Sequence, residues 1–360
     1  MSVKILLLPG DGIGPEVINV GRKVIEKLSH KFDLDVNFDE GLIGHAAIEA
    51  TGEPLPQETL DKANQADSIL LGAVGHPSYD NNPKAKVRPE QGLLKIREEL
   101  GLFANLRPVK IFPQLIDSSP LKPEIIEGTD ILFFRELTGG IYFGKPRGRR
   151  DDDKTAFDTM IYSKYEVERI SRMAFEAAQK RSKKVLSVDK ANVLESSRLW
   201  RETVEEIAKD YPDVELTHQF VDSAAMKLLT VPRSFDVILT ENLFGDILTD
   251  EASQIAGSMG LLASASIGNK VGIFEPIHGS APDIAGLDIA NPLATILSVA
   301  LMFEIAFNRK DIAGAVEDAV EKTLHQGYRT GDLVLDKNLI EGNKMVLGTQ
   351  QMGDKVVENL

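Results

Sequence analysis

The sequence predicts an α/β protein with a largely parallel sheet, and three observations lead to this class. Residues 185–258 alternate between short apolar runs and longer amphipathic runs, as the strands and helices of a parallel sheet do. The first forty residues read as a strand, a helix and a second strand. The length of 360 residues favours two lobes over one large domain.

Composition excludes several classes of protein. The formal net charge is −14 and the isoelectric point is near 5.0, which argues against a nucleic-acid or anionic-membrane surface. An anionic substrate would therefore need locally clustered arginines. The chain contains no cysteine, so it has no disulfide, thiolate nucleophile or zinc–thiolate site. This is compatible with a reducing cytoplasm, where we expect the protein to be.

Two apolar stretches are neither membrane-spanning nor targeting segments by the length and polarity of their sequences. The run at the start is too short for a signal peptide and meets Asp11 at once. The run Leu293–Phe307 has about fifteen residues and contains Glu304, so it is too short and too polar to span a bilayer. We therefore expect a soluble protein.

The N-terminal unit is predicted from its apolar pattern. Val3–Leu8 reads as a buried strand, a helix follows to about His30, and a second strand lies near Leu34–Phe38. The turn between the first strand and the helix carries glycines at 10, 12 and 14, but Val17 occupies the next slot of the dinucleotide fingerprint. The turn either binds a phosphate group through its backbone amides, or is a tight turn that contacts a different ligand or none.

The next elements are a helix at Gln57–Gln65, a strand at Ser68–Leu71 and a loop at His76–Pro89 rich in Pro, Asn and Tyr. Such a loop is typical of a mobile segment near a site.

The predicted helix Glu90–Leu100 has an unusual face. Leu93 and Leu94 lie four and three residues before Arg97, so two aliphatic side chains flank a guanidinium. The leucines could face the core while the arginine reaches to solvent, or the three could line a site together.

Two further arginines stand beside strand-like stretches. Arg107 follows Leu102–Leu106, and Arg135 follows Ile131–Phe134. Tyr142 comes soon after, in a glycine-flanked apolar segment. Guanidinium groups suit bidentate binding of carboxylates, so the arginines could hold a dicarboxylic acid, although each could equally form a surface ion pair.

The segment between the arginines and the second half is polar. Lys145–Lys154 has no apolar residue and is predicted to be an exposed loop, and Thr155–Ser163 alternates as a protruding strand pair or arm would. Tyr165–Arg181 is predicted to be an amphipathic helix.

The regular second half delivers acidic residues to strand ends. The expected elements are Val185–Val188, Leu194–Tyr211, Val214–Phe220, Asp222–Val231, Phe235–Thr240 and Phe244–Ser258. Ligands of open parallel sheets gather at the carboxyl ends of strands. Here these ends carry Asp189-Lys190, Asp222 and, after a predicted helix cap at Asn242, Asp246 and Asp250.

The Asp246 and Asp250 pair has two readings. Four residues apart on a helix, the two carboxylates share one face about 6 Å apart at Cβ. They are either two solvated aspartates or ligands of a hard cation such as Mg²⁺ or Mn²⁺.

The last third is predicted to hold a strand at Val271–Phe274, a loop of small residues from Glu275 to Gly286 and helices thereafter. Small residues allow a ligand to approach the backbone closely.

Several motifs together resemble a known family. They are G-D-G-I-G-P-E at 10–16, R-P-E-Q-G-L-L-K-I-R at 88–97, F-A-N-L-R-P at 103–108, R-E-L-T-G-G-I-Y-F-G at 135–144, V-D-K-A-N-V-L at 188–194, N-L-F-G-D-I-L-T-D at 242–250 and H-G-S-A-P-D-I-A-G at 278–286. The chain resembles the decarboxylating β-hydroxyacid dehydrogenases, the isocitrate/isopropylmalate dehydrogenase family. The resemblance covers essentially the whole chain.

The resemblance implies a two-lobed fold of that family, distinct from a standard Rossmann domain. Residues 1–102 and 258–360 would form a discontinuous cofactor-binding lobe, and residues 103–257 a central lobe with the dimer interface, the arm and the metal-binding residues. The active site would be shared within a homodimer, with Lys190 and Asp222 supplied by the partner. One departure is G-H-P-S-Y at 75–79, where relatives often carry G-G-P-K-W.

The resemblance also implies NAD and Mg²⁺ or Mn²⁺ as cofactors, for oxidation of a secondary alcohol followed by loss of the neighbouring β-carboxylate. Lys190 would be the base and Tyr142 the acid, and Asp222, Asp246 and Asp250 would bind the metal, with Asp222 also near the substrate. The substrate's carboxylates would be bound by Arg97, Arg107 and Arg135, and its branched alkyl group by Leu93 and Leu94. The cofactor-binding residues would be Gly75, Glu90, His278, Gly279, Ser280, Ala281, Asp283 and Asn291.

Three other functions remain open at this stage. A sister enzyme could act on D-malate, tartrate or homoisocitrate with the same residues. A magnesium phosphotransferase could use the same carboxylates, but this chain contains no G-x-x-x-x-G-K-S/T loop for a nucleotide's phosphates. A non-catalytic regulatory homologue would have no reason to hold the full set of candidate site residues.

Overall fold

The computed structural model describes residues 2–79, 82, 85–335 and 345–360. The chain forms two compact units. The terminal unit comprises Met1–Gly101, Phe112–Pro120 and Ala256–Leu360, and the central unit comprises Leu102–Ile111 and Leu121–Ile255. Phe112–Pro120, within the range expected for the central lobe, clusters with the terminal unit, where the Ser118 hydroxyl donates to the Leu333 carbonyl at 2.8 Å.

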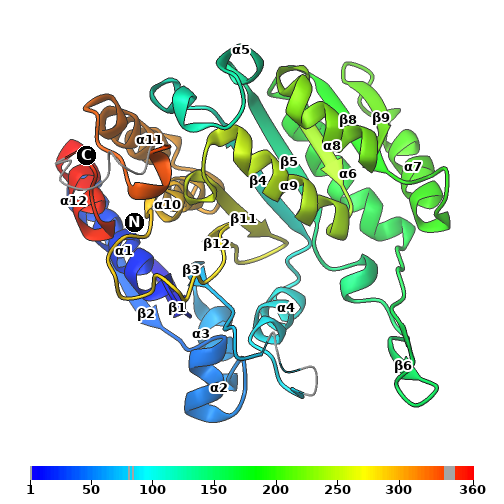
Figure 1. Cartoon of the computed structure of the whole chain (residues 1–360), viewed down its shortest axis with the longest axis horizontal. Coiled ribbons are helices and arrows are strands. Elements are labelled where there is room, and N and C mark those ends of the chain that lie inside the picture. The colour runs from blue at the N-terminus through cyan, green and yellow to red at the C-terminus, as the bar shows by residue number, and fades with distance from the viewer. Residues whose placement is uncertain (1, 80–81, 83–84, 336–344) are drawn as a thin grey trace. The chain divides into compact units, whose positions relative to one another are not determined.

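The terminal unit is built on a sheet with the strand order β2-β1-β3-β12-β11 (Figure 1). Neighbouring strands are parallel except β12 and β11. The strands are β1 (Ser2–Gly10), β2 (Asp35–Glu40), β3 (Ser68–Ala73), β11 (Ala263–Ile267) and β12 (Ile273–Pro276). The helices are α1 (Gly14–Phe32), α2 (His45–Thr51), α3 (Gln57–Gln65), α4 (Glu90–Glu99), α10 (Leu293–Ile305), α11 (Lys310–His325) and α12 (Thr349–Asn359).

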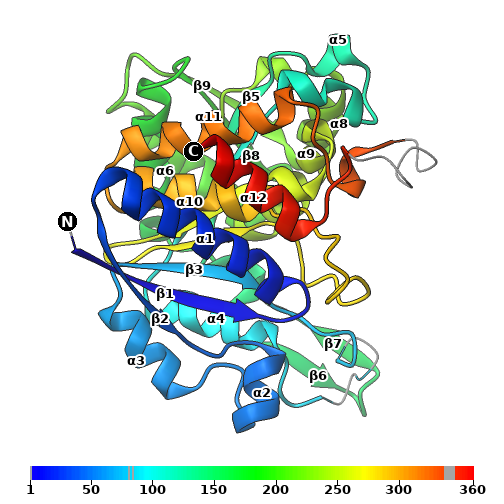
Figure 2. The same ribbon diagram turned by 90° about the vertical axis from the view of Figure 1, so that its left-hand side faces the viewer.

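Helices cover both faces of this sheet. The group α1, α10, α11 and α12 lies on one side of β1 and β3, and α2 and α3 lie on the other (Figure 2). Strand β3 is buried at every position, which explains its continuous apolar sequence. Helix α10 is almost wholly buried within the unit. Among the described residues no helix is both long and apolar enough to cross a membrane.

The central unit has the strand order β4-β5-β10-β8-β9. Its neighbouring strands are parallel except β4 and β5. The strands are β4 (Ala104–Lys110), β5 (Asp130–Glu136), β8 (Lys184–Asp189), β9 (Glu215–Phe220) and β10 (Val237–Thr240). The helices are α5 (Pro123–Ile126), α6 (Lys164–Gln179), α7 (Glu195–Ala208), α8 (Val221–Thr230) and α9 (Asn242–Ala256). The predicted α/β class with a largely parallel sheet is confirmed.

A separate antiparallel pair, β6 (Gly148–Arg150) and β7 (Thr155–Phe157), forms an arm of the central unit. Strand β6 lies in the segment predicted to be a loop, so that prediction was wrong for these three residues. Because β6 is exposed at every position, it has no apolar alternation by which the sequence could reveal it.

The turn between β1 and α1 is held by the chain itself. Asp11 is 4% exposed, and its carboxylate accepts hydrogen bonds from the amides of His45, Ala46 and Gly75 at 2.8–2.9 Å. Gly10 has a φ of +69°, and a Cβ there would lie 1.9 Å from the Ala73 carbonyl oxygen. A carboxylate inside the turn repels a phosphate, so the structure supports the tight-turn reading.

Two glycines with left-handed backbone allow the effect of backbone strain on stability to be measured apart from the effect of a steric clash. Gly52 has a φ of +82° with nothing within 4 Å of an added Cβ, so it differs from Gly10 only in space. We expect Gly52→Ala to reduce the free energy of unfolding by about 1 kcal/mol, the cost of left-handed backbone. Gly10→Ala should cost at least about 2 kcal/mol more, because a backbone carbonyl has to move. Urea unfolding followed by circular dichroism measures both, and equal losses would contradict the assignment.

Candidate functional site

The candidate site in the central unit is built where β5, β10 and α9 meet. The register pairs Thr240 of β10 with Arg135 of β5, and α9 begins two residues after Thr240. The helix then passes directly over the arginine, since a Cβ at Gly245 would lie 2.7 Å from Arg135 Cγ. The close approach therefore needs glycine at position 245.

Arg135 is the most enclosed of the site's cations, at 3% exposed. Its Nη1 donates to Asp246 Oδ1 at 2.5 Å, and its Nε and Nη2 donate to Asn242 Oδ1 at 3.1 and 2.8 Å. The Asn242 amide nitrogen in turn donates to the carbonyls of Leu137 and Gly139. Asn242 was predicted to cap α9, and this is corrected, because its side chain instead joins Arg135 to the loop after β5.

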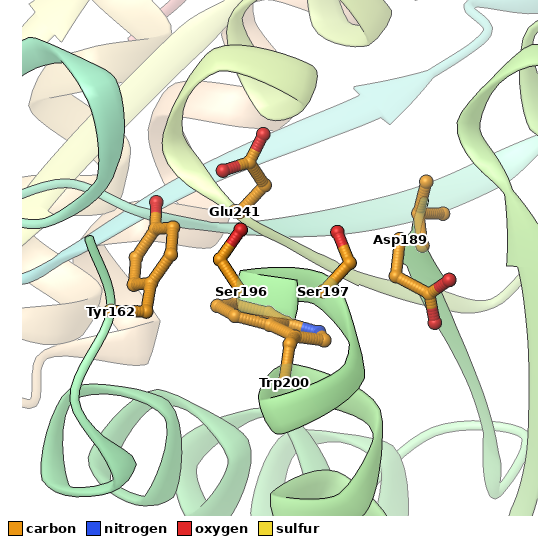
Figure 3. A pocket seen from close by; sticks show the side chains of 7 residues that line it. Tyr162, Asp189, Ser196, Ser197, Trp200 and Glu241 are labelled. Atoms are coloured by element: carbon orange, nitrogen blue, oxygen red, sulfur yellow. The ribbon is translucent and has the colours of Figure 1, made fainter. Parts of the chain in front are cut away.

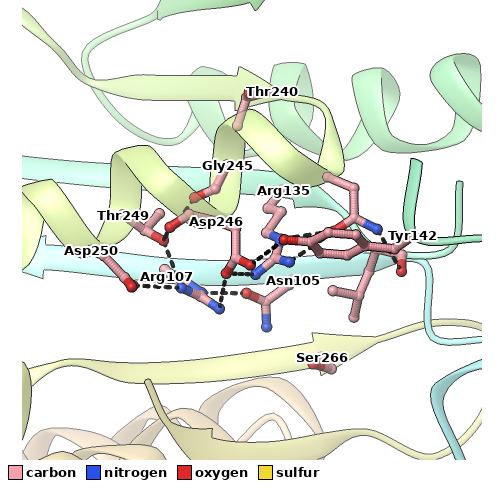
Figure 4. Close-up of polar contacts among 12 residues, drawn as sticks. Asn105, Arg107, Arg135, Tyr142, Thr240, Gly245, Asp246, Thr249, Asp250 and Ser266 are labelled. Carbon is pink, nitrogen blue, oxygen red and sulfur yellow. Dashed lines mark hydrogen bonds and ion pairs between the residues drawn. The ribbon is translucent and has the colours of Figure 1, made fainter. Parts of the chain in front are cut away.

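Arg107 of β4 is the second buried guanidinium, at 6% exposed. It donates to Asn105 Oδ1 and to the Thr249 hydroxyl, each at 2.6 Å. It also lies 3.9 Å from an oxygen of Asp246 and 3.7 Å from one of Asp250 (Figure 4). Both candidate carboxylates on α9 thus face a positive charge within their own chain.

Tyr142 completes this cluster, because its hydroxyl donates to Asp246 Oδ2 at 2.8 Å (Figure 4). Burial, together with the hydrogen bond to Asp246, raises the pKa of Tyr142 to about 12. The phenol therefore keeps its proton throughout the neutral range. Arg135, Arg107, Tyr142 and Asp246 are thus brought together as the sequence predicted, within one unit.

Asp246 and Asp250 differ in environment. The Asp246 side chain is 36% exposed and both its oxygens accept hydrogen bonds, from Arg135 and Tyr142. The Asp250 side chain is 55% exposed, and burial raises the pKa of its carboxyl against the pull of Arg107. Carboxylate oxygens suit Mg²⁺ or Mn²⁺, and an exposed pair can contribute ligands. Two carboxylates by themselves would supply only part of a coordination shell.

Lys190 and Asp222 form a separate pair. Lys190 Nζ lies 2.6 Å from Asp222 Oδ1, and the hydrogen bond from Lys190 lowers the pKa of the Asp222 carboxyl. Among the described residues, no three His, Cys, Asp or Glu side chains lie close enough to hold a metal ion together. Asp222 therefore does not join Asp246 and Asp250 within the described part of one chain.

In α4 of the terminal unit, the arginine is buried and the two leucines are partly exposed, the opposite of leucines in the core with an arginine that reaches to solvent. Arg97 is 7% exposed, whereas Leu93 and Leu94 are only half-buried. Arg97 Nη2 donates to Glu275 Oε1 at 2.7 Å, and both side chains are 8% exposed. The leucines thus remain available to an apolar group, and the arginine does not reach out to solvent.

Three candidate cofactor residues are neighbours in the terminal unit. A Cβ built at Gly75 would lie 3.3 Å from Glu90 Oε1 and 3.5 Å from Ser280 Oγ. Ser280 also accepts a backbone hydrogen bond from Ile13 at 2.8 Å, which ties its loop to the β1–α1 turn. The structure therefore brings the side chains of Glu90 and Ser280 close to the backbone at Gly75.

The remaining candidates of this loop are more varied. Gly279 and Asp283 are exposed, and Ala281 has a left-handed φ of +38°. Burial lowers the pKa of His278, so its ring is neutral at pH 7, and its Nε2 has no hydrogen-bond partner among the described residues. Asn291 is 6% exposed. Its side-chain nitrogen donates to Asp332 Oδ2 and its side-chain oxygen accepts from the Leu293 backbone amide, each at 3.0 Å, so both polar atoms have partners within the chain.

The loop that departs from the family pattern has its own packing. His76 stacks on His45 with ring centroids 3.9 Å apart, and Tyr79 meets His45 edge-on, with its hydroxyl 3.2 Å from His45 Nδ1. The three aromatic rings therefore pack on one another within the terminal unit.

Sequence reasoning missed several residues that hold the site. Glu275, Asn105 and Thr249 each bind one of the candidate arginines. Glu241 was also missed, although an acidic residue directly after a short strand rich in apolar residues is a signal in the sequence. Asn105 lies two residues before Arg107 on β4, so that its proximity is local, whereas Glu275 and Thr249 are brought to their arginines only by the fold.

Comparison with known proteins gives the family. A profile described as "Isocitrate/isopropylmalate dehydrogenase" matches residues 4–356. A 3-isopropylmalate dehydrogenase of Pseudomonas putida (strain KT2440) is 57% identical over all of this chain and 99% of that protein, and one of Saccharophagus degradans is 53% identical over the whole of both. Among solved structures, an isocitrate dehydrogenase from Methylococcus capsulatus aligns over 99% of both chains with a TM-score of 0.87 and 36% identity.

We expect the loss of one partner of the Arg97–Glu275 pair to destabilise the protein more than the replacement of both partners by apolar residues. Glu275→Gln leaves a buried guanidinium without its counter-charge, and we expect it to lower the free energy of unfolding by about 3 kcal/mol. The double variant Arg97→Leu/Glu275→Leu should lose less, because no charge remains buried.

Denaturant unfolding of the three proteins measures this difference. Glu98→Gln, an exposed residue on the same helix, is the matched control and should change little. A double variant less stable than Glu275→Gln would contradict the role given to the pair.

Proposed function

Because this chain belongs to the isocitrate/isopropylmalate dehydrogenase family, we propose that it catalyses the NAD-dependent oxidative decarboxylation of (2R,3S)-3-isopropylmalate to 4-methyl-2-oxopentanoate and CO₂, in leucine biosynthesis. Relatives with this activity in their names are 53–57% identical over essentially their full length. The observation that carries the proposal is the buried cluster of Arg107, Arg135, Tyr142 and Asp246, which combines carboxylate-binding cations with a proton donor.

The arginines bind and orient the substrate's carboxylates in this proposal. Arg107 and Arg135 are each held by two or more neighbours, so their guanidinium planes are fixed before a substrate arrives. Arg97 is similarly fixed by Glu275. Fixed charges contribute to rate by holding reacting groups in one geometry.

Lys190 and Tyr142 handle the protons. Lys190 takes the proton from the substrate's hydroxyl, and its contact with Asp222 provides a carboxylate for a proton relay. After loss of CO₂, Tyr142 protonates the substrate carbon. Its phenol is protonated at neutral pH, as an acid in this role requires.

Asp246 and Asp250 would hold the divalent metal, with Asp222 contributed by a second copy. Mg²⁺ or Mn²⁺ supplies Lewis-acid stabilisation of negative charge on a substrate oxygen. The separation of Asp222 from the α9 pair within one chain supports a site completed by a partner.

Gly75, Glu90, His278, Gly279, Ser280, Ala281, Asp283 and Asn291 are the residues proposed to bind NAD, which supplies the hydride acceptor. Asp283 is exposed and would accept hydrogen bonds from the ribose hydroxyls while repelling a 2′-phosphate. The ring of His278 is neutral, and its buried Nε2 has no hydrogen-bond partner among the described residues, so it could pair with a polar group of a nucleotide.

The partner in this proposal is a second copy of the chain. Large apolar side chains are exposed on α8 and α9 and just beyond α8: Met226, Leu229, Val231 and Ile247 are 64%, 37%, 47% and 59% exposed. Apolar side chains gathered on neighbouring elements mark association surfaces. These elements also carry Asp222, Asp246 and Asp250.

Substrate choice within the family depends on the apolar face. Leu93 and Leu94 are partly exposed and suit a branched alkyl group, whereas isocitrate or homoisocitrate would need a cationic or polar partner there. The alternative is a sister enzyme for isocitrate, homoisocitrate, D-malate or tartrate, and the structural likeness to an isocitrate dehydrogenase is the observation in its favour.

A substrate panel decides between these. We expect NADH formation, read at 340 nm, to be at least about tenfold more efficient with 3-isopropylmalate than with isocitrate, homoisocitrate, D-malate or tartrate. EDTA should abolish it and Mg²⁺ or Mn²⁺ restore it. A preference for another acid would overturn the substrate assignment and leave the family intact.

Sharing of the site is tested by mixing two inactive variants, Lys190→Ala and Asp250→Asn. If Lys190 acts in the partner's site, each mixed dimer has one site with both lesions and one with neither. Random reassortment after mild unfolding should therefore restore about a quarter of wild-type activity. Each variant reassorted alone is the control and should stay inactive. No recovery in the mixture would place both residues in one chain's site.

A further inference from the structure

Glu241 is a buried acid that the proposed reaction does not use. It stands between β10 and α9 and is 4% exposed. Neither carboxylate oxygen makes a hydrogen bond of normal geometry among the described residues, although the Phe244 amide and the Tyr162 hydroxyl lie close enough to lower the pKa of the carboxyl. With Tyr162, Ser197 and Trp200 it lines a narrow cavity (Figure 3) that has no room for a water molecule, with about 0 Å³ of water-accessible volume. Water in this cavity therefore cannot solvate the charge.

The neighbouring Tyr162 hydroxyl needs an acceptor. The Tyr162 oxygen accepts a hydrogen bond from the Asn242 backbone amide at 2.9 Å. One of its lone pairs is therefore used, and its own proton has to point to another acceptor. Two carboxyls, Glu241 and Glu136, lie close enough to raise the pKa of Tyr162, after the larger effect of burial. Tyr162 is thus a protonated donor facing two acids.

Glu136 is already satisfied. It accepts from the Thr138 amide and hydroxyl at 3.2 and 3.0 Å, from the Gly139 amide at 2.7 Å and from Arg169 at 3.2 Å. Four donors occupy the two oxygens of this carboxylate. Glu241 is therefore the acid with free acceptor capacity for Tyr162.

A series of contacts then leads from Tyr162 to the candidate site. The backbone amide bound by Tyr162 belongs to Asn242, whose side-chain oxygen accepts two hydrogen bonds from Arg135. Arg135 in turn binds Asp246, whose second oxygen accepts from Tyr142. A displacement of Asn242 would be transmitted to the guanidinium, because Arg135 is 3% exposed and has little room to adjust.

We propose that ionised Glu241 is a positioning residue for the reaction: it accepts a hydrogen bond from Tyr162, which fixes Asn242 and, through it, Arg135. The inference rests on the proposed function, because it assigns Arg135 to substrate binding. Glu241 itself touches no reacting atom in this scheme.

The charge state of Glu241 changes in the neutral range. Burial raises the pKa of its carboxyl to about 7, against the Phe244 amide and the Tyr162 hydroxyl, which lower it. Other charged groups near it are Glu136 and Arg135 from β5 and, across the cavity, Asp189 of β8, which is paired with Arg201 of α7. Once protonated, Glu241 becomes a donor and competes with the Asn242 amide for the Tyr162 oxygen. Substrate binding is thereby weakened as pH falls through 7.

Two substitutions of Glu241, together with Tyr162→Phe, test the kinetic consequence. Glu241→Gln keeps an acceptor that does not titrate, and Glu241→Leu removes it. We expect the KM for the hydroxyacid to rise about tenfold in Glu241→Leu and in Tyr162→Phe, with the KM for NAD unchanged. In Glu241→Gln the rise in hydroxyacid KM between pH 8 and pH 6 should be smaller than in the wild-type protein. Glu176→Gln, an exposed acid on α6, is the charge-matched control.

Thermal unfolding gives a readout that does not need activity. A carboxyl with a raised pKa in the folded state holds a proton that the unfolded chain has lost, so it reduces stability as pH rises from about 5 to about 7. The difference in Tm between Glu241→Gln and wild type should therefore grow in favour of the variant from pH 5 to pH 8. A constant difference would show that the pKa of Glu241 is not raised in the folded protein.

The outcomes separate the two proposals. If the wild-type protein forms no NADH with any acid of the panel, the proposed function fails, and the thermal result still decides the ionisation of Glu241. If the wild-type protein is active and Glu241→Gln keeps the full pH dependence of its hydroxyacid KM, or Glu241→Leu keeps the wild-type KM, the positioning role is overturned.

Discussion

The contact between Arg135 and Asp246 is the interaction on which the rest of the candidate site depends. A buried guanidinium is tolerated only when its charge is balanced and its donors are used. Asp246 supplies the counter-charge and Asn242 accepts two of the donors, and both come from the start of α9. Burial of Arg135 therefore fixes where this helix begins and how closely it passes, which in turn requires glycine at 245.

The same kind of contact would let an acidic protein bind the anionic substrate proposed for it. The chain carries a formal charge of −14, so its overall field repels a dicarboxylate. Each candidate arginine is buried beside carboxylates of its own chain: Arg135 beside Asp246, Arg107 near Asp246 and Asp250, and Arg97 beside Glu275. These carboxylates keep the guanidinium groups stable and oriented before any ligand arrives. Hydrogen bonds from Arg135 and Tyr142 meanwhile occupy both oxygens of Asp246, so a metal would have to share that carboxylate.

The acidic groups around the site divide by environment. Asp222 is exposed and paired with Lys190, Asp250 is half exposed, and Glu241 is buried without a hydrogen bond of normal geometry among the described residues. Burial accordingly raises the pKa of Glu241 to about 7, whereas the contact with Lys190 lowers the pKa of Asp222. The acidic residues near the site thus differ in how much water reaches them, which suits the exposed ones to the metal-binding role proposed for them and the buried Glu241 to the acceptor role proposed for it.

The sequence by itself determined the α/β class, most of the strands and helices, and the family, because apolar periodicity and long motifs are local signals. It also singled out Arg107, Arg135, Tyr142 and Asp246, since each stands within such a motif. It could not find α2, β11 or β6: α2 is only seven residues long, β11 is built from small residues that are weak strand formers, and β6 has no apolar residue. Only the tertiary structure decided that Arg97 is buried against Glu275, that Asn242 holds Arg135 and that Glu241 faces Tyr162. The first two contacts join residues more than one hundred positions apart and the third almost eighty, and no local pattern records which distant partner a side chain will meet.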